Sequence, residues 1–429
     1  MQLEALDVRG LFGHFDHSVR FNEPTEKPPR ASLTILHGPN GVGKTTLLRM
    51  LDGFLRPAGR RGGAYDIFRT VPFQSATLKV SGLDPISVES GTLAGRKTLN
   101  VTFGKHSAAL GGSLPNREPI TAQDVTKMRV LNDALDKATS ELHFEFVETA
   151  RIDRRALADP RIRRRYTVQD VPLQTLTPED AVLYESANFS PESLADRMAR
   201  FMLEAQANFR DYFVTSAPDL FQKLLDRLSA PNLAVEPADD LISRLKKVRE
   251  SDRVTERFGL LKERWDYTSL SAAIRGAGQA DDRTKAVMLA VVGQYVAMLE
   301  TRSIERSLIA DRLLTFERLM AGFLSGKKVL VDPRAGLRIE GEGGRLDEWM
   351  LSSGEYHLLY LMTSAVLARR HGTVIAIDEP EMSMHLAWQR MLIPALLECA
   401  AKSEPQFILA THSPDLVADF RSCLVQLGG

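Results

Sequence analysis

The sequence has little cysteine and no excess of charge of either sign. Its 429 residues include two cysteines, Cys399 and Cys423, which are too few for a disulfide framework or a four-cysteine zinc site. The 55 Lys and Arg residues balance the 55 Asp and Glu residues, so no net field draws the chain to nucleic acid or to an anionic membrane. Any such contact would therefore be local.

Long hydrophobic runs are also lacking. The most apolar window, residues 286–299, is shorter than the roughly 20 residues that span a bilayer, and it contains Gln294. No basic and apolar leader follows Met1. Hydrophobic residues make up 44% of the chain and charged residues 26%, which is typical of a globular protein and excludes bulk disorder. We therefore expect a cytoplasmic protein without a membrane partner.

Strand and helix patterns alternate at both ends of the chain, whereas the middle is helical. Residues 1–60 read as two strands, a glycine loop and a helix, and segments within 68–104 alternate apolar and polar residues as in an antiparallel sheet. A helix at 124–139 and a strand at 143–152 follow. We predict an α/β fold with a mixed sheet, split by a helical insertion: an N-terminal lobe at 1–165, the insertion at 166–325 and a C-terminal lobe at 326–429.

Helical periodicity dominates the insertion. Helices are expected at 191–214, 218–229, 239–263 and 284–324. In the last of these, apolar residues recur every three or four positions and form a seam with Arg302 and Arg306 in its middle. Two interpretations stay open: the seam is the core of a helical bundle within one chain, or it is a short coiled coil that pairs subunits.

A glycine-rich loop lies between a predicted strand and a predicted helix. The segment GPNGVGKT matches the phosphate-binding pattern G-x-x-x-x-G-K-[ST]. Backbone N–H groups and the helix N-terminus would surround the phosphates of ATP, Lys44 would reach the β- and γ-phosphates, and Thr45 would bind Mg²⁺. The predicted nucleotide-binding residues are Gly38, Pro39, Asn40, Gly41, Val42, Gly43, Lys44, Thr45 and Thr46.

Two other apolar segments end in polar residues. VIAID is followed by Glu379, and QFILAT is followed by His412. Because parallel sheets place ligands at the C-terminal ends of their strands, Asp378 would hold Mg²⁺ and Glu379 would take a proton from the attacking water. His412 would hydrogen-bond the γ-phosphate. A surface turn is the alternative for the acidic pair, and a structural role is the alternative for the histidine.

The segment LSSGE, residues 351–355, precedes a predicted helix. Ser352 or Ser353 can cap this helix, Gly354 permits close backbone approach, and together with Glu355 they would form a second anion site. One glycine loop does not need a second phosphate site in the same chain. The second site would therefore serve the nucleotide of a partner subunit, and a plain helix cap is the alternative.

These motifs, in this order around a helical block, resemble the ABC-type ATPase heads of the SMC, RecF and OLD (overcoming lysogenisation defect) group. The resemblance covers about 1–155 and 326–429, and DEPEMSMHLAWQ is similar to the group's D-loop with an H-x-x-x-Q extension. It implies a P-loop NTPase of the ABC type that uses ATP and Mg²⁺, with Lys44, Glu379 and His412 as catalytic residues. Such heads enclose two ATP molecules between two facing subunits.

The same resemblance implies a metal site made of Thr45, Asp378 and, after the FRTVP segment, Gln74. SGE stands where the group's signature usually ends in GGQ, and the large helical insertion does not fit a transporter ATPase. Too few residues follow His412 for the nuclease domain of full OLD proteins. We therefore expect a sensor or regulatory subunit, similar to stand-alone AAA-family ATPases of bacterial anti-phage systems, with a separate nuclease or toxin effector and homo-oligomers formed through the insertion.

One local stretch is strongly basic. Residues Arg151–Arg165, RIDRRALADPRIRRR, contain seven arginines and two aspartates. This stretch could contact DNA phosphates or an acidic partner, and a solvated loop is the alternative. The alternative function is therefore a RecF-like repair ATPase that binds DNA through these arginines.

Overall fold

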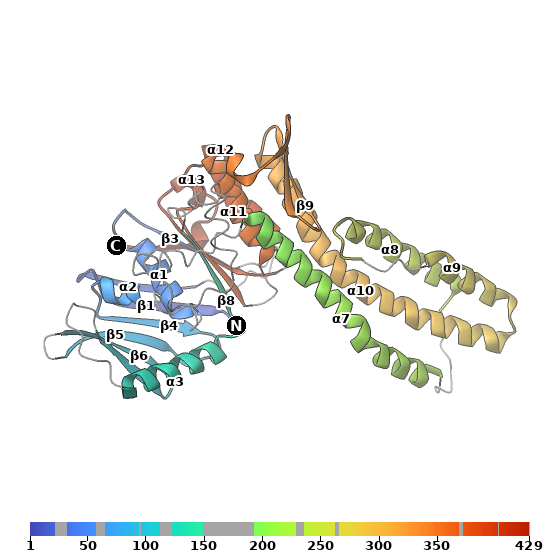
Figure 1. Cartoon of the computed structure of the whole chain (residues 1–429), viewed down its shortest axis with the longest axis horizontal. Coiled ribbons are helices and arrows are strands. Elements are labelled where there is room, and N and C mark those ends of the chain that lie inside the picture. The colour runs from blue at the N-terminus through green and yellow to red at the C-terminus, as the bar shows by residue number, and fades with distance from the viewer. Residues whose placement is uncertain are drawn as a thin grey trace, which may run out of the picture. The chain divides into compact units, whose positions relative to one another are not determined.

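The structure is a computed structural model that describes residues 1–21, 32–56, 65–93, 96–111, 122–148, 193–228, 236–261, 266–368, 372–401 and 403–428. Its contacts divide the chain into two compact units (Figure 1). Met1–Glu192 and Asp347–Gly429 form the first, here the α/β unit, and Ser193–Leu346 form the second, here the helical unit. The predicted lobe boundary at residue 165 lies outside the described residues.

A parallel five-stranded sheet forms the centre of the α/β unit, in the order β14-β3-β13-β12-β8. β12 and β13 are buried along their whole length, as their continuous apolar sequences predict. The strands are β3 (Ser32–His37), β8 (His143–Glu148), β12 (Thr373–Asp378), β13 (Gln406–Thr411) and β14 (Leu424–Gln426). The helices that accompany them are α1 (Lys44–Leu55), α11 (Ser353–Leu367), α12 (Leu386–Ala400) and α13 (Pro414–Val417).

A second, antiparallel sheet has the order β2-β1-β4-β5-β6-β7. Its strands are β1 (Leu3–Leu11), β2 (Phe15–Arg20), β4 (Ser75–Val80), β5 (Ile86–Leu93), β6 (Arg96–Phe103) and β7 (His106–Gly111), and α3 (Ala122–Ala138) packs on β7. One apolar cluster joins both sheets through α1, since Leu47 and Leu51 share it with Val8 and Ile408. The α/β class and the antiparallel sheet are thus confirmed, with parallel and antiparallel strands in separate sheets.

One segment of this sheet differs from its prediction. The sequence after position 68 was predicted as a strand, but Asp66–Thr70 form the short helix α2 and β4 begins only at Ser75. The Phe68 ring is fully buried and lies 5.0 Å from the Phe54 ring and 5.7 Å from the Phe73 ring. Packing of this aromatic cluster against α1 overrides the local alternation of polar and apolar residues.

The described residues of the helical unit include four α-helices and a small antiparallel sheet in the order β11-β10-β9. The helices are α7 (Leu194–Leu228), α8 (Ala238–Arg257), α9 (Tyr267–Gly276) and α10 (Asp282–Phe323), and the strands are β9 (Lys327–Asp332), β10 (Gly336–Gly341) and β11 (Gly344–Leu346). The helices predicted at 191–214 and 218–229 are one continuous helix, α7. The three strands cluster with the helices, although the sequence placed them in the C-terminal lobe.

The seam of α10 is buried within the helical unit. Leu299, Leu313, Phe316 and Met320 are fully buried, and the buried Arg306 forms an ion pair of 3.4 Å with Asp252 of α8. A seam filled by residues of the same chain favours the helical-bundle interpretation over a coiled coil between subunits.

α10 is also long and apolar enough, by length and composition alone, to cross a membrane. Its apolar window has a mean hydropathy of 1.2, and 39% of that window is buried inside the protein. A core helix of a globular protein passes the same test, so a single helix of this kind is weak support for a membrane span.

The seam can be tested by comparing two apolar positions of α10. We expect Leu299→Ala, at a fully buried site, to lower the free energy of unfolding by about 2–5 kcal/mol, because it leaves a cavity. Ile304→Ala, at a side chain that is 60% exposed, is expected to change it by less than about 0.5 kcal/mol. Urea denaturation measures both. Equal losses, or dissociation of an oligomer by Ile304→Ala, would contradict a seam internal to one chain.

Candidate functional site

The glycine loop joins β3 to α1. Gly41 and Gly43 have φ angles of 85° and 99°, a left-handed backbone that glycine adopts without strain. Lys44 begins α1 and is 6% exposed. Its Nζ donates hydrogen bonds to the carbonyls of Gly38 at 2.7 Å and Pro39 at 3.0 Å. The loop carbonyls therefore bind the ammonium group of Lys44, and no side chain in the described residues caps the N-terminus of α1.

The antiparallel sheet supports this loop through residues that the sequence did not reveal. His17 of β2 is buried, and its Nε2 donates a hydrogen bond of 2.9 Å to the Val42 carbonyl. A Cβ atom at Gly43 would lie 2.6 Å from the Leu11 side chain and 3.4 Å from the Phe12 ring. The turn between β1 and β2 thus packs directly on the loop and limits its backbone to glycine at this position.

Asp378 ends β12 and is 7% exposed. Its side chain is hydrogen-bonded to Thr45, the residue after the loop lysine. Burial raises the pKa of Asp378 to about 6; the charges of Glu379 and Glu148 add to this effect, and Thr45 and Arg49 oppose it. The structure therefore brings the predicted hydroxyl and carboxylate ligands of a metal ion into contact.

Glu148 is a second buried carboxylate at this edge, and it was not predicted. It ends β8 and lies opposite Asp378 in the parallel register, and it forms an ion pair with Arg49 of α1. The predicted strand at 143–152 offered the signal, because parallel neighbours end at the same edge of a sheet.

The side chains of Glu379 and His412, the residues that directly follow β12 and β13, lie close to each other. Glu379 Oε1 lies 3.6 Å from His412 Nδ1, and both side chains are partly exposed, at 34% and 50%. Glu379 has a φ of 48°, which is unusual for a residue with a side chain and is a form of strain that often accompanies functional sites. Its backbone N–H donates to the Ala410 carbonyl at 2.8 Å, which fixes this turn to β13.

The charges of this edge act on Lys44. Burial lowers the pKa of Lys44, while the carboxylates of Glu379, Asp378 and Glu381 act in the opposite direction. The lysine therefore lies within the electrostatic range of three acidic groups, one at the end of β12 and two that follow the strand. Lys44, Thr45, Asp378, Glu379 and His412 are thus gathered at one edge of the parallel sheet, as expected.

The LSSGE segment caps α11. Ser352 Oγ accepts a hydrogen bond from the Glu355 N–H, and the Glu355 carboxylate accepts one of 2.7 Å from the Ser352 N–H, a capping box. Ser353 is exposed at the first turn. A Cβ at Gly354 would lie 2.3 Å from the Ser383 carbonyl oxygen, so glycine is required there for contact with the loop after β12. The helix cap is present, and a role towards the nucleotide of a partner subunit stays a prediction.

His357 strengthens this contact between α11 and the loop. Its Nδ1 donates a hydrogen bond of 3.0 Å to the Met382 carbonyl, and burial lowers the pKa of the imidazole. Neutral imidazole is the form that a buried site favours. The LSSGE segment at the start of α11 and the loop that carries Glu379 are therefore held together within one chain.

Gln74 immediately precedes β4, beside β1. Its backbone N–H donates to the Arg9 carbonyl at 2.9 Å, and its side chain packs against Gly10. Phe12, two residues after Gly10, donates its N–H to Pro72 and touches the glycine loop. Gln74 is thus near the turn that supports the loop, and its role as a metal ligand stays a prediction.

No cluster of three or more His, Cys, Asp or Glu side chains suited to a metal ion occurs among the residues that the structure describes. A magnesium ion at Thr45 and Asp378 would therefore need oxygen atoms of a bound nucleotide to complete its ligands.

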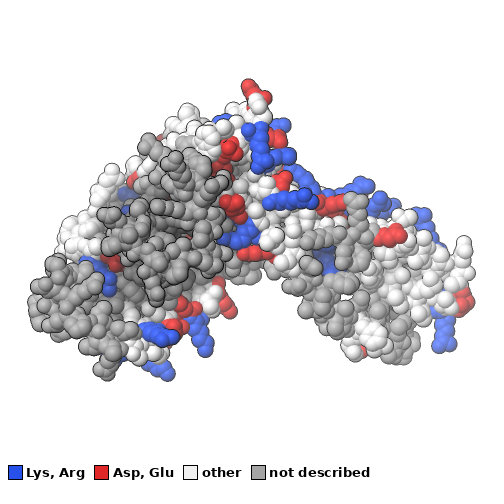
Figure 2. Space-filling view, viewed as in Figure 1, with Lys and Arg blue, Asp and Glu red and all other residues white. Residues whose placement is uncertain are grey.

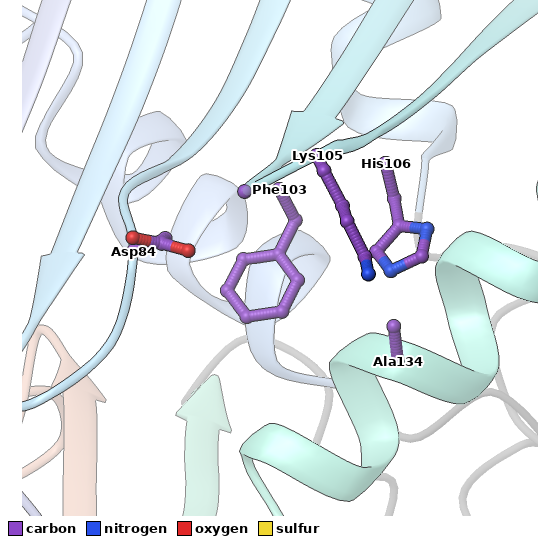
Figure 3. Close-up of a pocket in the computed structure, with 6 residues that line it drawn as sticks. Asp84, Phe103, Lys105, His106 and Ala134 are labelled. Carbon is purple, nitrogen blue, oxygen red and sulfur yellow. The ribbon is translucent and has the colours of Figure 1, made fainter.

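An open hollow lies elsewhere in the α/β unit, between the β6–β7 hairpin and α3 (Figure 3). The side chains of Lys105 and His106 point side by side towards Ala134 of α3. The Phe103 ring lines the middle of the hollow, and Asp84 lies farther away on the other side of this ring. None of the predicted site residues lines it. The hollow is therefore separate from the edge of the parallel sheet that carries the predicted site residues.

The basic stretch Arg151–Arg165 lies outside the described residues. In the face shown in Figure 2, Lys and Arg side chains of the helical unit are interspersed with Asp and Glu.

The glycine loop, the acidic end of β12 and the histidine after β13 together are the features of a P-loop ATPase domain. The chain belongs to the family described as "AAA domain, putative AbiEii toxin, Type IV TA system", whose match covers residues 151–418, more than half of its length. This range includes the signature segment, Asp378, Glu379 and His412 and begins after the glycine loop.

Solved structures similar to this chain include SMC head domains. The head domain with an extended coiled coil bound to the C-terminal domain of ScpA, from Pyrococcus furiosus, is 12% identical, with a TM-score of 0.39 over 97% of this chain and 91% of that chain. The SMC head domain from Thermotoga maritima is 11% identical, with a TM-score of 0.32 over 97% and 92%. TM-scores this low carry no weight for function. No curated protein sequence matches the chain.

The contact at Gly354 can be tested by adding one methyl group. We expect Gly354→Ala to lower the free energy of unfolding by about 1–3 kcal/mol, because the new Cβ would overlap the Ser383 carbonyl. Ser353→Ala, at the exposed neighbouring position, is the matched control and is expected to change it by less than about 0.5 kcal/mol. Thermal and urea unfolding measure both. Two indistinguishable variants would show that α11 does not need this close approach.

The raised pKa of Asp378 predicts a pH-dependent stability of the protein without nucleotide or Mg²⁺. Between the ordinary value of 3.8 and about 6 the folded state binds more protons than the unfolded state, so the free energy of unfolding falls as the pH rises through this window. Asp378→Asn removes this loss. We expect the variant to exceed wild type in stability at pH 8 and the difference to shrink at pH 4.

Urea denaturation at the two pH values measures this difference. Asp84→Asn, at an exposed carboxylate of the antiparallel sheet, is the control and is expected to give no such trend. A gain for Asp378→Asn that is the same at both pH values would contradict the raised pKa.

Proposed function

We propose that the protein binds Mg²⁺ and ATP at the glycine loop and hydrolyses the nucleotide. The observation that carries this proposal is the hydrogen bond between Thr45 and Asp378, which joins the loop to the acidic strand end. A hydroxyl and a carboxylate are the protein ligands that P-loop ATPases use for Mg²⁺. The burial and raised pKa of Asp378 fit a carboxylate whose charge a bound cation would stabilise. Thr45 and Asp378 would hold this metal ion, and it would neutralise charge on the phosphates.

The other residues have separate roles. Residues Gly38–Thr46 surround the phosphates, and Lys44 moves from the loop carbonyls to the β- and γ-phosphates, where its charge stabilises the transition state. Glu379 takes a proton from water as the water oxygen bonds to the γ-phosphorus. The bond from that phosphorus to the bridging oxygen breaks, and ADP and phosphate leave. His412 hydrogen-bonds the γ-phosphate and distinguishes ATP from ADP.

The proposal extends to assembly and biological role. Two subunits enclose ATP, with Ser352, Ser353, Gly354 and Glu355 of one facing the nucleotide of the other. The helical unit adds contacts in higher homo-oligomers. The protein acts in the cytoplasm as sensor or regulatory subunit of an anti-phage system with a separate nuclease or toxin effector. The family description, which mentions a putative toxin of a toxin–antitoxin system, supports this class of role.

Hydrolysis is tested with two variants. We expect Lys44→Ala to lower kcat/KM about a hundredfold or more, because the charge on the phosphates is lost. Glu379→Gln is expected to keep ATP affinity and to lower kcat about 100- to 10,000-fold, because no base takes the proton. Phosphate release measures the rates, and light scattering with ATP measures the dimer, which we expect Glu379→Gln to accumulate.

The matched controls are Lys105→Ala and Glu89→Gln, at exposed positions of the antiparallel sheet, and both are expected to keep wild-type rates. Wild-type hydrolysis by Glu379→Gln would exclude Glu379 as the base. ATPase activity that DNA stimulates, and that vanishes when the arginines within Arg151–Arg165 become Glu, would favour the RecF-like repair function instead.

A further inference from the structure

Glu381 is a buried carboxylate with no role in the mechanism above. It is 6% exposed, and within the described part of the chain its Oε2 has no hydrogen-bond partner. A buried carboxylate is costly unless it is hydrogen-bonded or paired. Glu381 also follows two other acidic residues, Asp378 and Glu379, so stability alone does not explain a buried carboxylate at this position.

The contacts of Glu381 run to the end of β13. Its Oε1 accepts a hydrogen bond of 2.6 Å from the Thr411 hydroxyl and one of 3.3 Å from the His412 backbone N–H. The same oxygen lies 3.5 Å from His412 Nδ1, and Glu379 Oε1 lies 3.6 Å from that nitrogen. Nδ1 of His412 thus lies near two carboxylates, and Glu381 is also hydrogen-bonded to the backbone N–H of His412.

A closed ring of hydrogen bonds holds Glu381 in place. Thr411 Oγ1 accepts from the Ser413 N–H at 2.9 Å, and Ser413 Oγ donates to Gln389 Oε1 at 2.9 Å. Gln389 Nε2 donates to the Met384 carbonyl at 3.2 Å, and the Met384 N–H donates to the Glu381 carbonyl at 3.0 Å. The glutamine of the H-x-x-x-Q extension therefore closes the ring from α12.

The backbone of the turn after β12 brings the side chains of Glu379 and Glu381 close to His412. Glu379 has a positive φ and Pro380 follows it, and the Met382 N–H donates to the Glu379 carbonyl at 3.1 Å. A residue at an unusual φ changes the chain direction and sends neighbouring side chains to different places than an extended strand would. The Glu379 side chain is partly exposed and the Glu381 side chain is buried, and each has an oxygen within 3.6 Å of the same ring nitrogen.

We propose that Glu381 is a positioning residue that orients His412 by drawing its Nδ1–H, so that Nε2 faces the γ-phosphate. The partner of one imidazole nitrogen sets the tautomer and direction of the other. This inference rests on the proposed ATPase function for its kinetic consequence.

The kinetic test is a double-mutant cycle of Glu381→Gln with His412→Ala. Glu381→Gln is expected to lower kcat about tenfold and to leave the Kd for ATP within about twofold, since the orientation of His412 matters most in the transition state. In the His412→Ala background it is expected to have no further effect. Equal losses in both backgrounds would overturn the proposal, as would a loss confined to ATP affinity.

A second measurement does not depend on catalysis. The ¹⁵N shifts of labelled histidine report which ring nitrogen carries the proton, and the spectrum of His412→Ala assigns His412 among the nine histidines. Wild type is expected to carry the proton on Nδ1, and Glu381→Gln is expected to lose that preference. A wild-type His412 protonated on Nε2 alone would overturn the proposal. Absence of ATP hydrolysis in wild type would count against the proposed function and leave this result intact.

Two further variants guard against an effect of misfolding. Thr411→Val keeps the shape of a buried side chain and removes the hydroxyl that donates to Glu381, so it is expected to repeat the kinetic effect and its dependence on His412. Asp415→Asn is the control. It removes a carboxylate that lies two residues after Ser413 and accepts a hydrogen bond from the exposed Arg390, and it is expected to leave kcat within about twofold of wild type. A tenfold loss in Asp415→Asn, or none in Thr411→Val, would overturn the proposal.

Discussion

The parallel alignment of β3, β13, β12 and β8 is the constraint on which the candidate site depends. Because neighbouring strands run in one direction, the segments that follow them emerge at the same edge, in the same lateral order. The glycine loop, His412, Asp378 and Glu148 are neighbours for this reason, although long stretches of chain separate them. The hydrogen bond between Thr45 and Asp378 is the contact that this alignment makes possible.

Features encoded locally could be predicted from the sequence. The glycine loop, the apolar strands that end at Asp378 and Thr411, and the long helix α10 all depend on short-range patterns, and the structure contains them. Glu381, Glu148 and His17 could not be found this way, because their positions depend on a left-handed turn, a parallel register and the packing of β2 on the loop. The short helix α2 was missed because an aromatic cluster outweighs its local pattern.

Buried charge at the site has a cost that the rest of the fold offsets. Asp378 is buried at this edge, and its burial together with the charges of Glu379 and Glu148 raises its pKa. Lys44 and Arg49 supply the nearby positive charge, and the apolar cluster around α1 supplies the stabilisation. A site of this kind is less stable empty than filled, because a bound cation would relieve the repulsion.

The loop between Glu379 and Met384 touches His412 on one side and the start of α11 on the other. When two binding sites share one segment, their coupling is reciprocal. A ligand that moves the segment at one site changes the binding free energy of the ligand at the other site, and the second ligand changes that of the first by the same amount. A molecule that contacts the exposed residues Ser352 and Ser353 at the start of α11 would thus respond to the presence of the γ-phosphate. In the other direction, release of phosphate would loosen that molecule without any contact between them.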